Sequence, residues 1–502
     1  MRNRGIVVGF ALAAIVAASG SSGTSVVSGF SRTFEAPEQQ GPSTAGMVVK
    51  GKAPVSNDVL KIKLPKPQEA TLANGLRLMV LEDHRLPRVS FQIIVPGAGG
   101  YYDPAPTIGL SSYAAQMMRE GTKSKSSQQI SQELETMAAN VNVGAGTSGT
   151  NATISGGALT ENLDRLFDLT ADVLLNPTFP ADEWERVKTR ARTGLIQQRT
   201  QPGFLSQERF TKVIFGEHPG GRVSATPETL DAITRDAMIE WHRTKLVPDH
   251  ALIAFAGDIT LADARKLADT KLAAWKKAGT PKPAVTEPAA SGAAKVYLVG
   301  RPGSVQTSLQ VGTQSMVRTD PDYIPLTVAN RVLGGVMGRL FRHLREEKGY
   351  TYGIGSSFSA LQHRGSWSAS TNVRTDVTDP ALTDLMAEID EMRTKPVPDK
   401  ELNDHKRAIV ASFALSLEQP EQLLGYYVQN WMYNLPADYW DTYPAKVSAV
   451  TPAQAQAAAA KYWDASKLQI VAVGDAAKIT DIMKKKGTVE IYDADGKPVK
   501  GS

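Results

Sequence analysis

The sequence predicts an α+β fold of two homologous halves, each with antiparallel sheets covered by helices, that together form a clamshell. Residues 253–258 (IAFAGD) match residues 470–475 (IVAVGD) without a gap, at an offset of 217 residues. At the same offset, residues 232–234 match residues 449–451. A stretch of prolines and small residues at 278–294 has the composition of a semi-rigid linker. Two related halves joined by a linker most naturally close around something that lies between them.

The composition is that of a soluble globular protein. The chain has 502 residues, of which 42% are hydrophobic and 21% are charged, and this length corresponds to about two to four domains. The net charge is +5, but the 56 basic and 51 acidic residues are interspersed, so nucleic acid is not an expected partner. The absence of cysteine excludes disulfides, thiol nucleophiles, zinc–thiolate sites and a lipoprotein anchor.

The N-terminus predicts export. Arg2 and Arg4 precede an apolar run at 6–18, and small residues follow at 19–23. This is the pattern of a secretory signal peptide over residues 1–23, and it predicts a periplasmic mature protein. The apolar run is short for a membrane span. An uncleaved N-terminus that anchors the protein in the membrane remains the alternative, and we expect no other membrane contact.

An N-terminal half is expected at 65–277, after an extended leader at 24–64. The leader is rich in Ser, Gly, Pro and Lys and shows no sustained periodicity. The N-terminal half opens with a hairpin that turns at Asn74-Gly75. Further strands are expected at 88–95, 141–155 and 250–256, and helices at 110–119, 127–139, 160–175, 181–200 and 227–243.

A C-terminal half is expected at 295–502, after the linker at 278–294. Strands are expected at 295–299, 307–314 and 365–373, and helices at 322–333, 380–393, 398–417 and 420–433.

The segment at 339–357 (RLFRHLREEKGYTYGIGSS) predicts a helix that ends at Gly349 and leads into a strand, with Tyr352 on one face of that strand. Arg345 lies in the last helical turn, seven residues before Tyr352. A guanidinium and a phenol on adjoining rigid elements can both donate hydrogen bonds to one oxygen-rich ligand. On these residues alone, a purely structural role for the segment remains open.

The residues by themselves contain no complete catalytic constellation. None of the seven histidines lies three to five residues from another, so the helical metal-ligand pair of a zinc enzyme is missing. There is also no G-x-S-x-G elbow, no P-loop and no dinucleotide fingerprint.

Taken together, several short motifs resemble the pitrilysin, insulysin and mitochondrial processing peptidase family of inverted-zincin metallopeptidases. The likeness runs from about residue 65 to residue 485 in the order and spacing of that family. The motifs are Asn74-Gly75-Leu76, Gly109-Leu110, Gly121-Thr122, Glu217-His218-Pro219-Gly220-Gly221, Gly257-Asp258 and the segment from Leu344 to Tyr352.

The resemblance also identifies what has been lost. The family carries H-x-x-E-H on the helix between the Gly-Leu and Gly-Thr motifs, and a third zinc ligand on a later helix. In this chain the two histidine positions are Ser112 and Gln116, the glutamate position is Ala115, and the third ligand position falls at about Gly194. Zinc needs imidazole, thiolate or carboxylate ligands. We therefore expect no metal and no cofactor in this chain.

In family members, an arginine and a tyrosine seven residues apart in the C-terminal half reach the peptide at the zinc site. These positions are Arg345 and Tyr352 here. Some bacterial members divide the zinc motif and this pair between two chains. The resemblance therefore predicts a non-catalytic subunit, inactive alone, that supplies both residues in trans to a zinc-motif-bearing homologous subunit and its peptide substrate.

Two alternatives remain. One is an inert structural or binding subunit of a larger complex, with no role in proteolysis. The other is a self-sufficient enzyme whose catalytic residues match no known pattern.

Overall fold

The computed structural model of the chain describes residues 60–499. The predicted signal peptide, with its alternative membrane anchor, and residues 24–59 of the predicted leader lie outside the described residues. The last part of the leader, 60–64, contains no helix or strand, and Leu64 is packed into the core of the second half. Within 60–499, no helix combines the length and the apolar character that a membrane crossing requires.

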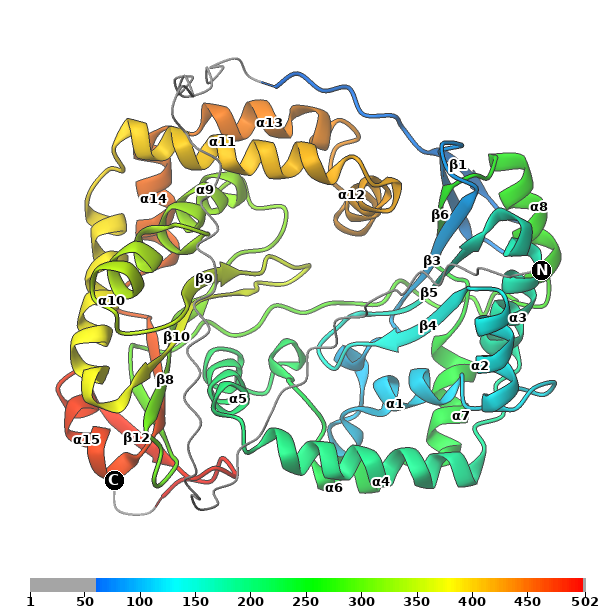
Figure 1. The fold of residues 1–502 in the computed structure, drawn as a ribbon. Coiled ribbons are helices and arrows are strands. Elements are labelled where there is room, and N and C mark those ends of the chain that lie inside the picture. The colour runs from blue at the N-terminus through cyan, green and yellow to red at the C-terminus, as the bar shows by residue number, and fades with distance from the viewer. Residues whose placement is uncertain (1–59, 500–502) are drawn as a thin grey trace, which may run out of the picture. The chain divides into compact units, whose positions relative to one another are not determined.

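The first half contains a mixed sheet of six strands in the order β1-β2-β6-β3-β5-β4 (Figure 1). The predicted antiparallel pairing holds for every neighbouring pair except β2 and β6, which run parallel. The exception arises because β6 joins the sheet through a long helical connection instead of a hairpin. The strands are β1 (Gln68–Thr71), β2 (Arg77–Glu82), β3 (Arg88–Pro96), β4 (Asn140–Ala145), β5 (Asn151–Leu159) and β6 (Leu252–Gly257).

The second half repeats this arrangement in the order β12-β7-β11-β8-β10-β9. Here β7 is parallel to both β11 and β12, and the remaining neighbours are antiparallel. The strands are β7 (Val296–Gly300), β8 (Gln306–Gln314), β9 (Ile354–Phe358), β10 (Ser366–Arg374), β11 (Gln469–Gly474) and β12 (Val489–Tyr492).

The internal similarity of the sequence corresponds to equivalent elements of the two halves. Strands β6 and β11 hold the third place in their sheets and begin 217 residues apart, at 252 and 469. Helices α7 (Arg235–Lys245) and α14 (Pro452–Tyr462) begin at the same offset. Their N-caps are Thr234 and Thr451, and each threonine side chain accepts a hydrogen bond from the backbone N–H three residues later.

The helices of the first half lie mainly against one face of its sheet. Ile253 and Phe255 of β6 point into the core formed with α1, α3 and α7, whereas Leu252 and Ala254 point to the opposite face. Besides α7, the helices are α1 (Leu110–Met117), α2 (Ser127–Thr136), α3 (Leu163–Leu175), α4 (Ala181–Gln198), α5 (Pro202–Phe215), α6 (Pro227–Ala232) and α8 (Leu261–Lys271).

The second half has its own helices over the corresponding face of its sheet (Figure 1). Besides α14, they are α9 (Tyr323–Gly334), α10 (Thr378–Thr394), α11 (Asp399–Ser416), α12 (Pro420–Tyr433), α13 (Tyr439–Ala449) and α15 (Ala476–Lys484).

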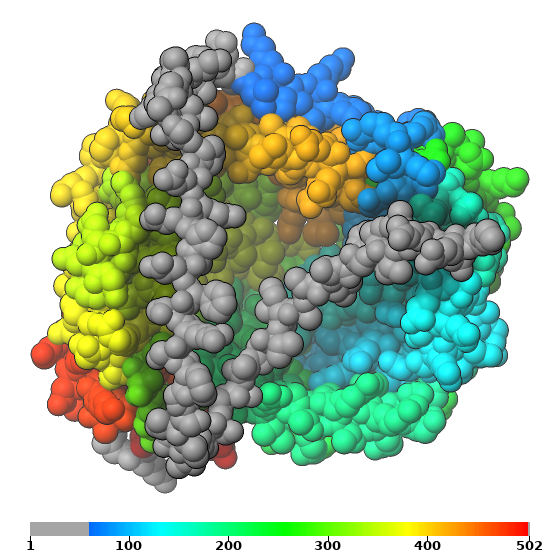
Figure 2. All heavy atoms as spheres, viewed as in Figure 1, coloured from blue at the N-terminus to red at the C-terminus, as the bar shows by residue number. Residues whose placement is uncertain are grey.

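The two halves exchange one helix each, which the sequence did not predict. Helix α5 of the first half packs on β8 and β11 of the second sheet, and α12 of the second half packs on β6 of the first sheet. In Figure 2 orange atoms of the second half meet blue atoms of the first half. Between β3 and α12, Ser90 donates a hydrogen bond of 2.8 Å to Glu421. The main layer of helices therefore lies over one face of each sheet, as predicted, and the exchanged helix covers only part of the other face. On that other face Asn142 of β4 and Asn372 of β10 remain exposed.

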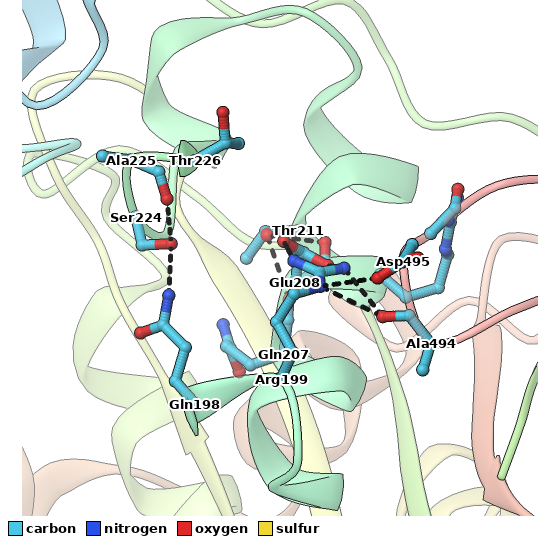
Figure 3. Close-up of polar contacts among 12 residues, drawn as sticks. Gln198, Arg199, Gln207, Glu208, Thr211, Ser224, Ala225, Thr226, Ala494 and Asp495 are labelled. Carbon is cyan, nitrogen blue, oxygen red and sulfur yellow. Dashed lines mark hydrogen bonds and ion pairs between the residues drawn. The ribbon is translucent and has the colours of Figure 1, made fainter. Parts of the chain in front are cut away.

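Figure 3 shows a second link between the halves. Arg199, after α4, donates hydrogen bonds to Glu208 of α5 and to the carbonyl oxygen of Ala494, which follows β12. Arg209 of α5 donates to the Gly496 carbonyl at 2.8 Å, and its guanidinium carbon lies 3.4 Å from the ring centroid of Tyr492. The segment after β12 is therefore held against the helix that the first half contributes to the second sheet.

Two predicted elements of the first half are divided. The strand expected at 141–155 is the hairpin of β4 and β5, because the Gly-rich residues 146–150 form its turn. The helix expected at 227–243 is interrupted at Ile233, where Thr234 starts α7 as a new N-cap. Helices α5 and α8 were not predicted.

Candidate active-site element

The segment that carries Arg345 is a π-helix, Phe341–Glu347. The Lys348 N–H donates to the carbonyl oxygen of His343, five residues earlier, at 3.0 Å. The wider turn of a π-helix is rare in proteins and is found frequently at functional sites. The predicted helix therefore exists, with a hydrogen-bond spacing that its sequence did not reveal.

The predicted end of this helix at Gly349 is confirmed. Gly349 has a φ of +65°, and its N–H donates to the carbonyl oxygen of Arg345 at 3.2 Å. This bond is the one that defines an αL C-terminal cap, and the Tyr350 N–H also reaches back to the Leu344 carbonyl at 3.0 Å. Glycine adopts this φ at a lower conformational cost than a residue with a side chain, so it is favoured at this position.

The prediction that Tyr352 lies on a strand is wrong, because β9 begins only at Ile354. The hydroxyl of Thr351 accepts a hydrogen bond from the Gly353 N–H at 3.1 Å and holds residues 351–353 in a local turn. Thr371 of β10 donates to the Gly353 carbonyl at 3.0 Å and fixes this turn to the sheet. Tyr352 lies at the turn and is 95% exposed.

Arg345 is also exposed, and its guanidinium carbon lies 4.6 Å from the ring centroid of Phe341. Among residues 60–499, no carboxylate forms an ion pair with it. Phe341 is four residues earlier, on the same helical face, and holds the side chain by a cation–π contact. The charge of Arg345 is therefore positioned while its hydrogen-bond donors remain available.

Buried leucines and charged contacts to neighbouring helices hold the π-helix in place. Leu340 and Leu344 are fully buried beneath it. Arg339, six residues before Arg345, donates to both carboxylate oxygens of Glu401 on α11, at 3.0 and 2.8 Å. Arg342 donates to the same carboxylate at 2.9 Å.

His343 forms a further contact, at 2.8 Å, with Glu388 of α10.

The contacts from the two arginines also affect the ionisation of Glu401. Burial alone would raise the pKa of Glu401, but the hydrogen bond from Arg339 and the charges of both arginines outweigh it and lower the pKa. Glu401 is therefore charged in the folded protein and anchors the helix by charge-assisted hydrogen bonds.

The three zinc-motif positions lie on α1. Ser112 is partly buried, and its hydroxyl donates to the Ala145 carbonyl of β4 at 2.5 Å, a contact that ties the helix to the sheet edge. Ala115 is fully buried, and Gln116 is exposed. A hydroxyl already used as a donor, a methyl group and a neutral amide do not fit the ligand requirements of zinc.

The fourth position, Gly194, lies in the last quarter of α4 and is exposed, with no atom within 4 Å of the place where a Cβ would stand. In the described range 60–499, no group of three or more His, Asp or Glu side chains is placed to hold a metal ion. Nor does any recorded hydrogen bond, ion pair or ring contact in that range join Arg345 or Tyr352 to the four positions.

Comparison with known proteins identifies the family. Residues 78–222 match "Insulinase (Peptidase family M16)", and residues 232–409 match "Peptidase M16 inactive domain". The chain belongs to the M16 peptidase family. The second match contains the whole π-helix and Tyr352, so the M16 inactive-domain match includes Arg345 and its anchors.

Relatives of this M16 chain include several zinc proteases. It is 24% identical over 354 residues to the uncharacterized zinc protease YmxG of Bacillus subtilis, covering 69% of this chain and 84% of the relative. It is 25% identical over 407 residues to an uncharacterized zinc protease of Streptomyces coelicolor, covering 78% and 86%.

Solved structures agree with this assignment. A peptidase M16 inactive domain from Pseudomonas fluorescens has a TM-score of 0.74 and 27% identity, covering 81% of this chain and 98% of that one. A protease from Helicobacter pylori has a TM-score of 0.76 at 15% identity, covering 82% and 100%, and shares the fold.

Sequence reasoning missed two residues that position Arg345 in this M16 protein. Phe341 precedes Arg345 by four residues, and an aromatic–arginine pair at that spacing on a helix is a detectable signal. Glu401 follows Arg342 by 59 residues on another helix, and no local pattern connects them.

Proposed function

We propose that this chain is the non-catalytic subunit of a heteromeric zinc metalloendopeptidase that degrades peptides or unfolded proteins. The partner is a homologous subunit that carries the zinc motif and binds the metal. This chain binds no zinc and contributes Arg345 and Tyr352 to the partner's active site. The predicted signal peptide supports a periplasmic location for the complex.

One observation carries the proposal: Arg345 is held over Phe341 and anchored through its helix, yet has no carboxylate partner among the described residues. Arg339 and Arg342, which precede it on the same segment, both pair with Glu401, whereas Arg345 does not. Tyr352 is likewise turned to solvent, at 95% exposure. Both donors are therefore available to a ligand that another chain brings.

The chemistry of peptide hydrolysis gives these donors a role. Negative charge develops on the carbonyl oxygen of the scissile bond as a hydroxide attacks it. Hydrogen-bond donors aimed at that oxygen stabilise the transition state by about 3–4 kcal/mol for each donor. The guanidinium of Arg345 donates without losing its charge at any working pH, and the Tyr352 hydroxyl supplies a second, neutral donor.

The test is hydrolysis of an unstructured peptide by this chain together with an M16 partner that carries H-x-x-E-H. Arg345→Ala or Tyr352→Phe should lower kcat about 100- to 1000-fold without changing the zinc content. Arg165→Ala, which removes an exposed arginine from α3, is the matched control. If both variants retain full activity, the chain has a structural role and the proposed contribution to catalysis is wrong.

A second measurement addresses the chain alone. The purified protein should contain no stoichiometric zinc and should not hydrolyse peptides, because its four zinc-ligand and base positions lack suitable donors. Peptide hydrolysis by the isolated chain that resists chelators would identify a self-sufficient enzyme and overturn the proposal.

A further inference from the structure

The second half contains a pocket of about 490 Å³ between α9, β9 and helices α11 to α13. Its volume falls in the range of ligand-binding pockets, about 300–1000 Å³. No residue with an expected function lines it. Six of its fourteen lining residues are aromatic: Tyr323, Phe358, Phe413, Tyr426, Trp440 and Tyr443.

The aromatic walls are fixed by contacts among themselves. The rings of Tyr426 and Trp440 are 4.3 Å apart, and Phe413 stacks on Trp440 at 5.9 Å. The indole N–H of Trp440 donates to the Tyr426 carbonyl at 2.8 Å. The pocket is therefore preformed, and a ligand that enters it orders few additional side chains.

One charged side chain, Arg331 of α9, also lines the pocket. Its Nε is buried without a hydrogen-bond partner, and no ion pair reaches its guanidinium within residues 60–499. By contrast, the nearby Arg339 and Arg342 both bind Glu401. A buried donor without a partner is costly, so the Nε of Arg331 has hydrogen-bonding capacity that no described residue uses.

The backbone next to Arg331 leaves room for its side chain. A Cβ at Gly335 would lie only 2.5 Å from the Arg331 Cδ, so a larger residue at that position would displace the arginine. The guanidinium also acts on the neighbouring His405. Burial lowers the pKa of His405, and the charges of Arg331 and Arg342 lower it further, against the opposing effect of Glu401.

Two neutral polar side chains of the lining have unused hydrogen-bonding capacity. Ser412 of α11 and Gln429 of α12 line the pocket and make no recorded hydrogen bond to another residue of the range 60–499. Asn330, in contrast, is fully engaged, because its Oδ1 accepts from Trp367 at 2.8 Å and from Ser356 at 2.7 Å. Ser412 and Gln429 can therefore bind the amide groups of a peptide.

We propose that this aromatic pocket is a peptide-binding subsite that takes a bulky apolar side chain whose neighbouring carboxylate pairs with Arg331. The aromatic rings would contact the apolar side chain of the peptide. The ligand is expected to carry a carboxylate because an anion is needed to neutralise the guanidinium of Arg331. The inference rests on the proposed function only in taking a peptide as the ligand. It adds a preference that Arg345 and Tyr352 do not provide.

The carboxylate has two possible sources, an Asp or Glu side chain or the C-terminus of the peptide. Fluorescence anisotropy of the purified chain with short fluorescein-labelled peptides separates them. One pair of probes compares an internal Phe-Asp with Phe-Asn, and the other compares a terminal Phe acid with its amide. The chain should bind the acidic member of at least one pair about 10- to 100-fold more tightly. Equal binding within both pairs would overturn the proposal.

Variants then assign the preference to this pocket. Arg331→Gln should remove the discrimination between the acidic and neutral probes, whereas Arg165→Gln on α3 should leave it unchanged. Ser412→Phe, at an exposed position of the lining, should fill the pocket and weaken both probes of a pair by a similar factor. Undiminished discrimination in Arg331→Gln, or undiminished binding in Ser412→Phe, would contradict the assignment.

The outcome is separable from the test of the proposed function. The anisotropy measurement uses this chain without a partner and without hydrolysis, whereas the Arg345 and Tyr352 variants are judged by kcat in the complex. If Arg331→Gln changes nothing while Arg345→Ala lowers kcat, only the subsite is wrong. The opposite pattern would retain the subsite and remove the catalytic role.

Discussion

The guanidinium of Arg345 lies over the ring of Phe341, with 4.6 Å between the guanidinium carbon and the ring centroid. Both residues belong to one π-helical segment, so their relative position is set by a single backbone element. The ring limits the rotamers of a long, exposed side chain without using any of its five N–H donors. This contact makes Arg345 a positioned donor, and it can be tested apart from Arg345 itself.

Replacing Phe341 with Leu should lower kcat of the complex with a zinc-bearing partner by about two- to fivefold, because an exposed cation–π contact contributes about 0.5–1 kcal/mol. Phe341→Tyr, which keeps the ring, should retain activity. Steady-state kinetics with an unstructured peptide measures both variants. Equal losses in the two would show that the ring acts through packing alone.

Glu401→Gln should lower the free energy of unfolding by about 2–3 kcal/mol, because it leaves the largely buried guanidinium of Arg339 without its charged partner. The neighbouring Asp404→Asn removes a charge from exposed ion pairs with Lys400 and Arg407 and should change stability by less than about 0.5 kcal/mol. Urea denaturation of both variants gives the comparison. A similar loss in both would mean that the Arg339–Glu401 contact is unimportant.

Two glycines should respond oppositely to alanine. Gly194 lies inside α4 with open space around its missing Cβ, so Gly194→Ala should raise stability by about 0.5–1 kcal/mol. Gly257 has a φ of +121°, and its Cβ would lie 2.1 Å from the Arg88 carbonyl oxygen, so Gly257→Ala should cost more than about 3 kcal/mol. Thermal unfolding distinguishes the two. A destabilised Gly194→Ala would show that this position has a neighbour in solution.

Stability should fall as the pH decreases below about 6.5. Burial lowers the pKa of three histidines, His242, His363 and His405. As the pH falls, these histidines are therefore protonated in the unfolded chain before they are protonated in the folded protein. Their stabilisation of the folded state is fully present above the unfolded pKa and is lost as the pH falls toward the folded pKa. Each contributes up to about 1.4 kcal/mol per pH unit in that interval.

The pH dependence is measured from urea denaturation at about pH 7.5 and pH 5.5. His405→Gln should reduce the difference between the two conditions. His250→Gln, which replaces an exposed histidine, serves as the control. An unchanged difference in His405→Gln would contradict the assignment for that residue.

The repeated architecture was predictable because the repeated sequences belong to single strands and helix caps, which form from local sequence. The sequence of β6 recurs in β11, and the threonine caps of α7 and α14 recur with it. Gly349 was predictable for the same reason, since the end of a helix needs a residue that tolerates positive φ. The exchanged helix α5 was not predicted. Its apolar residues face a sheet that begins about 80 residues later in the chain, and no local sequence pattern indicates that contact.

The sequence predicted which two residues form the candidate site, but it did not predict the backbone conformation that positions them. Arg345 and Tyr352 followed from the motif, whereas the π-helical spacing depends on which carbonyl each N–H selects. Tyr352 was assigned to a strand because tyrosines alternate with small residues there, but the hydroxyl of Thr351 competes for the backbone and forms a turn. The aromatic pocket with Arg331 combines residues from several helices and one strand, and only the tertiary fold brings them together.

The exchange of α5 and α12 has a consequence for how the chain matures. The last strand of the first sheet, β6, is complete at residue 257, but the helix that covers its second face, α12, starts at residue 420. During synthesis or export, more than 160 residues must emerge before Leu252, Ala254 and Ala256 are covered. The nascent first half therefore presents an apolar sheet face to its surroundings, and general chaperones are expected to bind it until α12 arrives.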